Sequence, residues 1–568
     1  MASATPSIRG SATASEEVRL LPPLVAALLL LLPGATRAAL AQPTPQEVTV
    51  GFLQGEPDSL DPNRTRFAFV DEAAVIRQVF EPLLRFDEKL TPQPAAAESF
   101  DVSADGTVVT FHLRRDGRWS DGQPVTAGQF EYSWKRLLDP ALNAAYAAFF
   151  VDAGITGADE YNAGRVPSPD NVGVRALDDY TLEIRLNQPF GALADLAALW
   201  VASPLRPDIV AANPDGWATD PSTYIGNGPF AMTDWVHGDH ITLSPNSQYM
   251  EHANWPRPTL TRATLVMTTN PAADYAAFAS NARDWTRVPE ADVNQVLNDP
   301  NLAAQSRQYA ELTTYWVNVN TARAPLSNVT LRRALATAID RKALIRDIAG
   351  GIGLPMTSII PPGMPGFQES LGQELGFDAA AAKKLLAQAG FSPTANGQTL
   401  PSLAFDFPAT LANQRRAEYL QAQWKQNLGV DIRLTPMDPA AYQQALSARN
   451  YDLAFGGWAA DYPDPQDWLN PVFGCTGSYN TVNYCNPDFD QLVARADAAT
   501  TPNERLPLYN AAQARLIDET PVVPLFALGH LVLVKPWVRS TDGGPLPITA
   551  LDEYPGSFFL DRVQILPH

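Results

Sequence analysis

One acidic side chain, Asp461, lies between two aromatic residues in the segment Phe455–Asn470, which reads FGGWAADYPDPQDWLN. A carboxylate flanked by Trp458 and Tyr462 can accept charge-assisted hydrogen bonds from the ammonium group of a ligand, while the rings supply apolar surface for it. A plain turn role is the alternative, because aspartate is common in turns. The spacing alone leaves both interpretations open.

Two further aspartates in this segment have local structural roles in our interpretation. Asp464 precedes Pro465, which is the pattern of a helix N-cap followed by a proline in the first turn. Asp467 then falls within that first turn, where a negative charge interacts favourably with the helix dipole. Asp461 is therefore the carboxylate left for ligand binding.

Signatures of catalysis and of metal binding are missing from the sequence. It contains no nucleophile elbow, phosphate-binding glycine loop or zinc-protease helix motif. Of the six histidines, only His237 and His240 are close together, and a strong metal site needs more ligands. We therefore expect no cofactor, no metal and no enzymatic activity. A secreted hydrolase is the alternative from another class, and it would need a nucleophile–base pair that we do not find.

The elements around Asp461 have the pattern of an open α/β sheet. Helical and strand patterns alternate here: a helix over 411–428, a strand over 430–434, a helix over 440–446 and a strand over 451–458. The first helix stops at Gly429, the residue type that best tolerates a left-handed cap. The strand–helix–strand order predicts a parallel pair with a right-handed crossover. Since ligands bind beyond the carboxyl ends of the strands in such sheets, the segment after Trp458 is the expected site.

Elements nearer the N-terminus alternate in the same way. The patterns predict a strand over 47–53, a helix over 71–80, a strand over 108–113, and a helix that begins at a capping box of Thr126 and Gln129 and runs through Leu137.

Length, composition and charge indicate a globular protein of several lobes. At 568 residues the chain exceeds what one hydrophobic core usually serves, and its 50 prolines indicate many extended connections. The chain has 41 basic and 61 acidic residues, a net charge of −20. Such a surface repels a phosphate backbone, so we expect no nucleic acid among its partners.

The N-terminal segment is typical of a secretory signal peptide. An apolar run over 24–32 follows two arginines, and small residues at 39–41 offer a cleavage site. We predict that residues 1–41 are removed and that the mature chain begins near Gln42. No cysteine follows this cleavage site, so we expect a free periplasmic protein and not a lipoprotein.

The two cysteines, Cys475 and Cys485, lie close together in the stretch CTGSYNTVNYC. In an oxidising compartment this spacing predicts a local disulfide, worth roughly 2–4 kcal/mol. Unpaired thiols are the less favoured alternative, and a metal site is less favoured still because no histidine is near either cysteine in the sequence.

Longer motifs resemble a known family. Residues 114–140 read RRDGRWSDGQPVTAGQFEYSWKRLLDP and follow AAESFDVSADGTVVTFHL. Further motifs are SLDP at 59–62, FEPLL at 80–84, GNGPFAMTDWV at 226–236, LRRALATAIDR at 331–341, GWAADY at 457–462 and LVKPWV at 533–538. In this order they resemble family 5 of the bacterial extracellular solute-binding proteins, the oligopeptide- and dipeptide-binding group.

The resemblance implies an α/β, periplasmic binding protein-like fold (type II, cluster C), with two lobes, a hinge and an extra inserted domain. Lobe I would comprise 45–80, 206–312 and 530–568, the inserted domain 81–205, and lobe II 313–529. Strand crossovers near Leu312 and Gly529 would act as hinges for closure around a ligand.

The resemblance also implies roles for site residues. Asp461 would hold the α-ammonium group of a peptide. The backbone groups of Gly457 and Ala459 would pair with the peptide like an added strand, which gives affinity without reading its sequence. Trp458 and Tyr146 would line the cleft.

Other positions depart from the family pattern. A relative has an arginine and a histidine that help hold the carboxyl end of short peptides, and the aligned positions here are Phe455 and Asn413. A tryptophan of that cleft falls on Pro439, and Arg323 is a candidate replacement for a lysine nearby. Recognition of a short peptide's carboxylate is therefore not expected to carry over. Longer peptides, or a modified one such as a murein fragment, fit these substitutions.

The function expected from the resemblance is capture of oligopeptides for an ABC transporter. The partners would be the peptide and the permease subunits in the inner membrane, and the protein would act as a monomer. The alternative is the same fold with a dipeptide, a murein peptide, nickel or haem as cargo. Asp461 favours a free amine, and the lack of a histidine cluster argues against a metal.

Overall fold

The computed structural model describes residues 44–51, 55–57, 59–65, 70–392, 399–546 and 559–568. The predicted signal peptide over 1–41 and the predicted first mature residue, Gln42, lie outside these ranges. Within them, none of the helices has the length and apolar character needed to cross a membrane.

The largest sheet among the described residues is mixed. Its strand order within the described ranges is β15-β14-β16-β12-β17-β11-β1-β10-β9-β8, and β13 also pairs with β17. The strands are β1 (Glu47–Gly51), β8 (Phe230–Val236), β9 (His240–Pro245), β10 (Arg262–Val266), β11 (Trp285–Arg287), β12 (Ser306–Val319), β13 (Gly353–Pro355), β14 (Leu403–Pro408), β15 (Ile432–Met437), β16 (Leu453–Ala459) and β17 (Val522–Val534).

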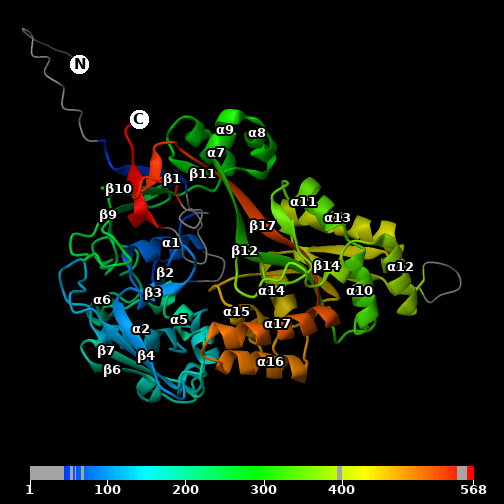
Figure 1. Cartoon of the computed structure of the whole chain (residues 1–568), viewed down its shortest axis with the longest axis horizontal. Coiled ribbons are helices and arrows are strands. Elements are labelled where there is room, and N and C mark those ends of the chain that lie inside the picture. Colours follow the sequence, from blue (N-terminus) through cyan, green and yellow to red (C-terminus); the bar gives the residue numbers. More distant parts are fainter. Residues whose placement is uncertain (1–43, 52–54, 58, 66–69, 393–398, 547–558) are drawn as a thin grey trace, which may run out of the picture. The chain divides into compact units, whose positions relative to one another are not determined.

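Two long antiparallel strands, β12 and β17, join the two ends of this sheet (Figure 1). They pair from Ser306 opposite Leu533 to Asn318 opposite Val522. The register shifts between Ala310 and Thr314, which is a bulge-like irregularity. The predicted crossovers near Leu312 and Gly529 fall on these strands at this irregularity.

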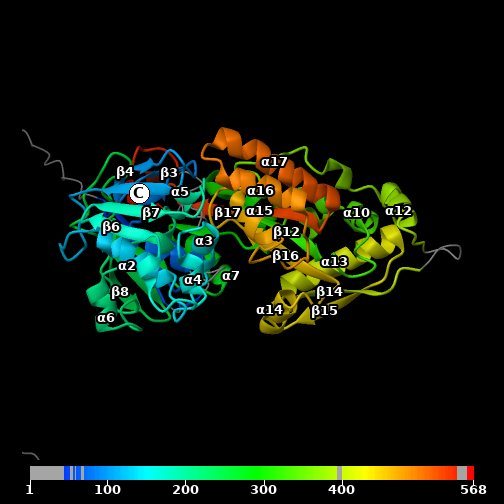
Figure 2. The ribbon, with the colours of Figure 1, turned by 90° about the horizontal axis from the view of Figure 1, so that it is seen from below.

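The second half of the chain supplies the helices α10 (Val329–Thr337), α11 (Arg341–Ile348), α12 (Ala379–Gln388), α13 (Leu411–Leu428), α14 (Pro439–Ser447), α15 (Gln466–Phe473), α16 (Pro487–Ala498) and α17 (Pro502–Glu519). Buried residues of α10–α13 and α15–α17 share one hydrophobic core with β12 and β14–β17. Helices α16 and α17 lie side by side beside α15 (Figures 1 and 2).

The predictions for the 411–458 region are confirmed in most respects. Helix α13 has the predicted bounds, and Gly429 caps it with a left-handed φ of 70°. Both flanking strands form, and both run parallel to β14, so they are parallel to one another. They are not neighbours, however, because β14 lies between them. The prediction that these two strands pair directly is therefore wrong, because the sequence pattern did not identify residues 403–408 as a strand.

The first half of the chain builds a separate sheet of order β4-β5-β7-β6. Its strands are β4 (Ala97–Val102), β5 (Val108–Leu113), β6 (Val174–Asp178) and β7 (Thr181–Arg185). Two short strand pairs lie outside both sheets. One is β2 (Leu84–Phe86) with β3 (Pro92–Pro94), and the other, near the C-terminus, is β18 (Val538–Ser540) with β19 (Val563–Ile565). The helices are α1 (Val70–Val79), α2 (Ala127–Leu137), α3 (Ala147–Asp152), α4 (Ala158–Asn162), α5 (Leu193–Leu196), α6 (Pro207–Ala212), α7 (Pro271–Ala279), α8 (Val293–Asn298) and α9 (Pro300–Gln305).

The predicted start of α2 is confirmed, because the backbone N–H of Thr126 donates to Oε1 of Gln129 at 2.8 Å. Strand β5 also has the predicted bounds. One hydrophobic core includes Val48, Phe111, Leu243 and Ile565, so it draws on the pieces assigned to lobe I and on the expected inserted domain alike.

Candidate functional site

A pocket of about 600 Å³ lies beside β16, with walls from β12, α13, α14 and the segments that follow β16 and α15. Most of the predicted site residues line it: Asn413, Phe455, Gly457, Trp458, Ala459 and Asp461. Tyr146 and Tyr462 are not part of its lining. The structure thus gathers residues from one helix, one strand and the segment that follows this strand around one cavity.

One edge of β16 faces this pocket. The opposite edge pairs with β12 from Leu453 to Ala459, and the N–H of Ala460 continues this pairing by donating to the carbonyl of Leu312 at 2.8 Å. Because successive residues of a strand direct their polar groups to opposite edges, Gly457 and Ala459 direct theirs away from β12. On that side, within the described ranges, β14 pairs with β16 only at Leu453 and Ala454.

The open edge is therefore available to another extended chain. The hydroxyl of Tyr442 donates to the carbonyl of Phe455, so the unpaired stretch of the edge begins after that residue. Gly457 is required by close packing, because a Cβ built on it would lie 2.9 Å from Cδ1 of Tyr315 and 3.0 Å from the carbonyl oxygen of Thr314. The edge at Gly457 and Ala459 has the properties needed for β-strand addition.

Asp461 is buried immediately beyond the carboxyl end of β16, with 3% of its surface exposed. Its backbone N–H donates to Oδ2 of Asp467 at 2.9 Å. The indole Nε1 of Trp458 donates to the same oxygen at 3.2 Å. Asp467 therefore positions both the candidate anchor and the aromatic wall beside it.

The role of Asp467 is larger than its place in the helix suggested. It does lie in the first turn of α15, as predicted, but its side chain is fully buried. Burial raises the pKa of Asp467 well above its ordinary value, and the adjacent charge of Asp461 raises it further. The raised pKa favours the protonated form of Asp467, beside the carboxyl group of Asp461 that lines the pocket.

Tyr146 and Tyr462 contribute from behind the pocket wall. Burial raises the pKa of Tyr146 well above its ordinary value, and so does Asp461, to which its hydroxyl is hydrogen-bonded. Tyr146 therefore remains a donor that fixes Asp461. Tyr462 is buried, its hydroxyl donates to Oε1 of Gln466, and its ring lies 5.9 Å from that of Phe149. Its contacts are those of a core residue.

A cluster of carboxyl groups extends behind Asp467. Asp464 accepts a hydrogen bond from the N–H of Gln466 at 2.9 Å and pairs with Arg505 at 2.7 Å, but the N-cap of α15 is Pro465 and not Asp464 as predicted. Burial raises the pKa of Asp497 to about 7, and burial together with the charge of Asp464 raises the pKa of Asp195 to about 8. Asp464 and Arg505 therefore pair inside a buried cluster whose other carboxyl groups hold their protons more tightly than free aspartates do.

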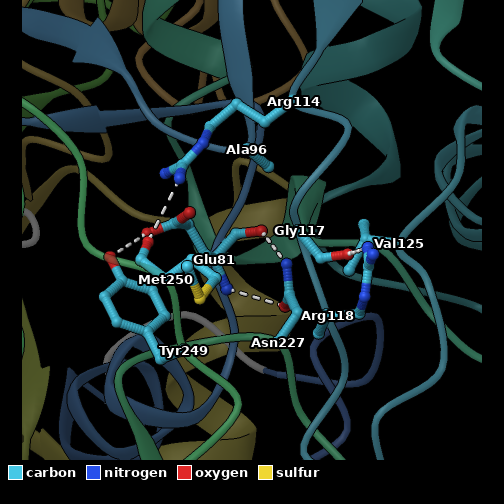
Figure 3. A pocket seen from close by; sticks show the side chains of 9 residues that line it. All are labelled: Glu81, Ala96, Arg114, Gly117, Arg118, Val125, Asn227, Tyr249 and Met250. Atoms are coloured by element: carbon cyan, nitrogen blue, oxygen red, sulfur yellow. Dashed lines mark hydrogen bonds between the residues drawn. The ribbon is translucent and has the colours of Figure 1, made fainter.

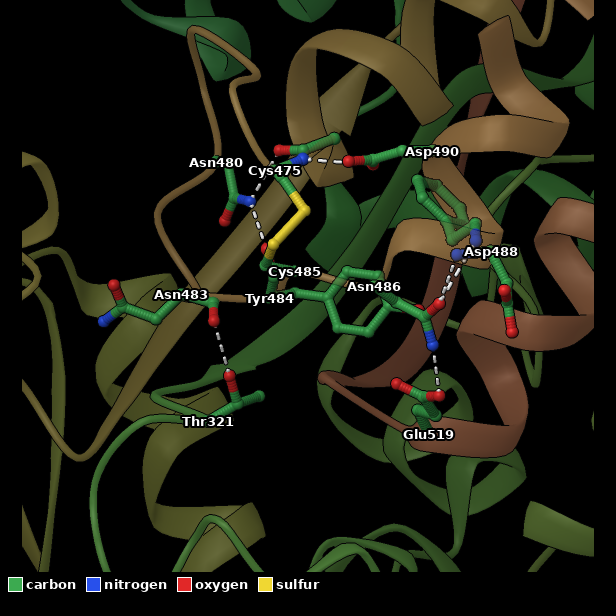
Figure 4. The surroundings of a disulfide bond; sticks show 12 residues. Thr321, Cys475, Asn480, Asn483, Tyr484, Cys485, Asn486, Asp488, Asp490 and Glu519 are labelled. Carbon is green, nitrogen blue, oxygen red and sulfur yellow. Dashed lines mark hydrogen bonds between the residues drawn. A yellow bond between two sulfur atoms is a disulfide. The ribbon is translucent and has the colours of Figure 1, made fainter. Parts of the chain in front are cut away.

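The predicted disulfide between Cys475 and Cys485 is confirmed (Figure 4). It closes a loop that internal hydrogen bonds also hold, because the side-chain amide of Asn480 donates to the carbonyls of Gly474 and Tyr484 at 2.8 and 2.7 Å. The same loop carries Tyr479, which lines the pocket with its ring 5.1 Å from that of Trp458. Tyr479 was not predicted as a site residue, although the sequence shows that it lies within the loop closed by the two cysteines.

Arg416 is a second site residue that was not predicted. It lines the pocket from α13, three residues after Asn413 and thus on the same face of the helix. Two residues that were compared with cleft residues of the family, Arg323 and Pro439, do not line the pocket. Arg323 pairs with Asp452 at 3.1 Å outside the pocket lining, and Pro439 begins α14 without lining the pocket.

The two neighbouring histidines each contact a carboxylate. His237 is exposed beside Glu56, and His240 lies beside Asp239. Among the described residues, the one group of ligand-type side chains close enough to share a metal ion is Cys475, Cys485 and Asp490. The disulfide already uses both sulfur atoms of that group.

Two other pockets are less suited to a ligand. A groove of about 610 Å³ along α2 contains charged side chains that already pair with acidic neighbours: Lys135 with Glu131 at 2.6 Å, and Arg136 with Asp61 at 2.6 Å.

The other is a small cavity of about 20 Å³ at Glu81, room for about one water molecule (Figure 3). Its polar groups bond to one another. The N–H of Glu81 donates to Oδ1 of Asn227 at 2.9 Å, and the hydroxyl of Tyr249 donates to Oε2 of Glu81 at 2.7 Å. This network joins segments distant in the sequence and has a structural role.

Comparison with known proteins adds independent findings. The model of the family described as bacterial extracellular solute-binding proteins, family 5 Middle, matches residues 91–480. The oligopeptide-binding protein OppA of Bacillus subtilis is 32% identical over 484 residues, which cover 84% of this chain and 86% of that protein. The periplasmic oligopeptide-binding protein OppA of Salmonella typhimurium is 31% identical over 550 residues, with 92% and 95% covered.

A solved structure agrees with these matches. The murein tripeptide binding protein MppA of Escherichia coli superposes with a TM-score of 0.74 and 29% sequence identity, and the match covers 92% of this chain and 99% of that one.

Proposed function

The chain belongs to family 5 of the bacterial extracellular solute-binding proteins, and we propose that it captures oligopeptides by their free α-ammonium group and delivers them to an ABC importer. The predicted α/β fold of the type II periplasmic binding proteins is confirmed. Both curated relatives described above are named as oligopeptide-binding proteins, and the solved structure is named for a murein tripeptide. Peptides are the cargo class that these names share.

The observation that carries the proposal is the position of Asp461 at the end of an open strand edge. A buried carboxylate at the carboxyl end of β16 attracts an ammonium group, and a charge-assisted hydrogen bond there is stronger than a neutral one. With its amino end at Asp461, a peptide extends along the pocket toward Phe455, antiparallel to β16. The backbone groups of Gly457 and Ala459 then pair with those of the peptide.

This arrangement would give binding with little sequence selectivity. Main-chain pairing and the ammonium contact involve groups that every linear peptide has. The walls of the pocket that face peptide side chains include the aromatic surfaces of Trp458 and Tyr479, which tolerate many residue types. We propose that the side-chain pockets are permissive for this reason.

The site of action and the partners also belong to this proposal. Cleavage after the predicted signal peptide, residues 1–41, would release the protein into the periplasm as a monomer without a lipid anchor. The disulfide between Cys475 and Cys485 supports an oxidising compartment. The permease subunits of an ABC transporter in the inner membrane would receive the peptide.

The identity of the cargo can be tested on the purified protein. Ligand released by denaturing the natively purified protein is analysed by mass spectrometry, and the molecules found are then offered to the refolded, ligand-free protein. We expect peptides of mixed sequence with unmodified amino termini. Release of a haem, a nickel chelate or another molecule without an amine would contradict the proposal, as would hydrolysis of the offered peptides.

A further inference from the structure

The pocket beside β16 has one acidic and one basic residue among those that line it, Asp461 and Arg416. Asp461 follows the carboxyl end of β16. Arg416 lies toward the amino-terminal end of that strand, because its guanidinium carbon is 5.9 Å from the ring centroid of Phe455. A pocket with opposite charges at its two ends suits a ligand that is itself positive at one end and negative at the other.

The guanidinium group of Arg416 is largely removed from water. Its side chain is 11% exposed, and aromatic rings surround it, with the centroids of Tyr315 and Phe526 at 5.7 and 5.6 Å. Cation–π contacts of this kind hold the group in place but do not satisfy its N–H donors.

Several donors of Arg416 lack a strong acceptor. Nη1 donates to Oδ1 of Asn413 at 3.3 Å, near the upper limit for a hydrogen bond. Nε is buried and has no hydrogen-bond partner within the described ranges. The nearest paired carboxylate is that of Glu290, 3.9 Å from Nη2 and 58% exposed. A buried cationic donor without an acceptor is costly, so an incoming carboxylate would be bound favourably.

We propose that Arg416 binds the C-terminal carboxylate of the peptide whose ammonium group Asp461 holds. This inference rests on the proposed function and adds a second anchor to it. The two positions that depart from the family pattern then acquire roles. Phe455 forms one face of the aromatic surroundings of Arg416, and Asn413 orients its guanidinium. The carboxylate site is supplied from α13, not from the strand.

The separation of the two anchors sets the length of the preferred peptide. Phe455 and Ala459 are four residues apart on β16, and a strand rises about 3.3 Å per residue, so they span roughly 13 Å, with Asp461 two residues beyond the end of the strand. An extended peptide has the same rise. A peptide of about four to six residues therefore places its ammonium group at Asp461 and its carboxylate at Arg416.

A purely structural role for Arg416 is the alternative. In that case its contact with Glu290, which begins a short turn of helix over Glu290–Asp292, would tie the strand region of residues 285–319 to α13. An ion pair at 3.9 Å with a mostly exposed partner contributes little. A ligand carboxylate in the aromatic surroundings is the stronger interaction.

The test compares free-acid and C-terminally amidated peptides. Alanine-rich peptides of three to seven residues with free amino termini are titrated by calorimetry into the ligand-free wild type, Arg416→Gln and Arg415→Gln. Arg415 is the exposed neighbour on α13 and serves as the control. We expect the wild type and Arg415→Gln to bind the free acids of four to six residues at least tenfold more tightly than the amides. Arg416→Gln should bind both forms with similar affinity, and a circular dichroism spectrum and an unfolding midpoint close to those of the wild type would show that it is folded.

The possible outcomes distinguish the role of Arg416 from the proposed function. Equal binding of acids and amides by the wild type at every length, or unchanged discrimination by Arg416→Gln, would overturn the role of Arg416 while leaving the ammonium site intact. Loss of discrimination in Glu290→Gln but not in Arg416→Gln would also overturn it. Failure of every peptide to bind the wild type would overturn the proposed function, and the role of Arg416 with it.

Discussion

The backbone N–H of Asp461 donates a 2.9 Å hydrogen bond to Oδ2 of Asp467, so one buried carboxyl group positions another. The same oxygen accepts the indole N–H of Trp458. The arrangement keeps the side chain of Asp461 directed at the pocket while its main chain is fixed. The raised pKa of Asp467 reduces the repulsion between the two groups, since a protonated carboxyl carries no charge.

Replacing Asp467 tests this positioning role. Asp467→Ala removes both hydrogen bonds, each worth about 1 kcal/mol, and should weaken peptide binding roughly tenfold or more. Asp467→Asn keeps an acceptor oxygen at the same place and should retain most of the affinity. Calorimetric titration with one free-amine peptide measures both. Equal losses in the two variants would mean that the hydrogen bonds from Asp461 and Trp458 do not matter for binding.

Removing the disulfide tests the stapled loop. The double variant Cys475→Ser, Cys485→Ser should lose roughly 2–4 kcal/mol of unfolding free energy, because the short loop is no longer closed in the unfolded chain. Peptide affinity should fall as well, since the loop carries Tyr479 against Trp458. Chemical denaturation with and without a reductant measures the first effect. The reductant should destabilise the wild type and leave the double variant unchanged, and a reductant effect on both would point to another cause.

The carboxyl cluster predicts how stability depends on pH. Burial raises the pKa of Asp497 from 3.8 to about 7, so the folded protein binds this proton more tightly than the unfolded chain does. The stabilisation is complete below pH 4 and is lost as the pH rises to about 7. At about 1.4 kcal/mol per pKa unit, the shift corresponds to at most roughly 4 kcal/mol.

Asp497→Asn should therefore lose less stability than the wild type between pH 5 and pH 7, by roughly 2 kcal/mol. Urea denaturation at a series of pH values measures this difference. The groups that contact or act on Asp497 are Tyr509, Asn470, Asp464 and Arg505, and none of them changes in the variant. Asp488→Asn, which alters a 75% exposed carboxylate of the same helix α16, serves as the control and should keep the wild-type slope. A wild-type slope in Asp497→Asn would contradict the assignment.

Local sequence signals predicted individual elements well. The helical pattern over 411–428 and the glycine after it match α13 and its left-handed cap, because both depend on residues close in the chain. The insertion of β14 between β15 and β16 could not be read in this way. Strand order depends on long-range pairing, and the flanking helix–strand pattern is the same whichever strands are neighbours.

The candidate site was predicted in part for the same reason. The GWAADY motif placed Gly457, Trp458, Ala459 and Asp461 together because they are consecutive on one strand and its end. The roles of two other residues depend on how deeply they are buried, which the sequence does not reveal. Tyr462 is adjacent to Asp461 in the chain yet points into the core, and Asp467 is a helix-start residue that also supports the site.

The position of Arg416 in the pocket could have been predicted from the helix periodicity, which a comparison of single motif positions does not consider. It lies three residues after Asn413, a spacing that places both side chains on one face of a helix. Comparing single aligned positions suggested that the positive charge had been lost. Considering the helix face as a unit suggests that it has moved by one turn.

The proposed function requires that Asp461 hold the α-ammonium group of a peptide. Calorimetry should titrate one peptide and its N-acetylated form into ligand-free wild type, Asp461→Asn and, as a control, Asp431→Asn, whose side chain is 77% exposed. Removing one partner of a buried charge pair costs about 2–5 kcal/mol, so Asp461→Asn should bind the free peptide at least tenfold more weakly than the wild type or Asp431→Asn. Acetylation should weaken binding to the wild type by a similar factor and have little further effect on Asp461→Asn. An unchanged dissociation constant in Asp461→Asn, or equal binding of both peptide forms by the wild type, would contradict the claim.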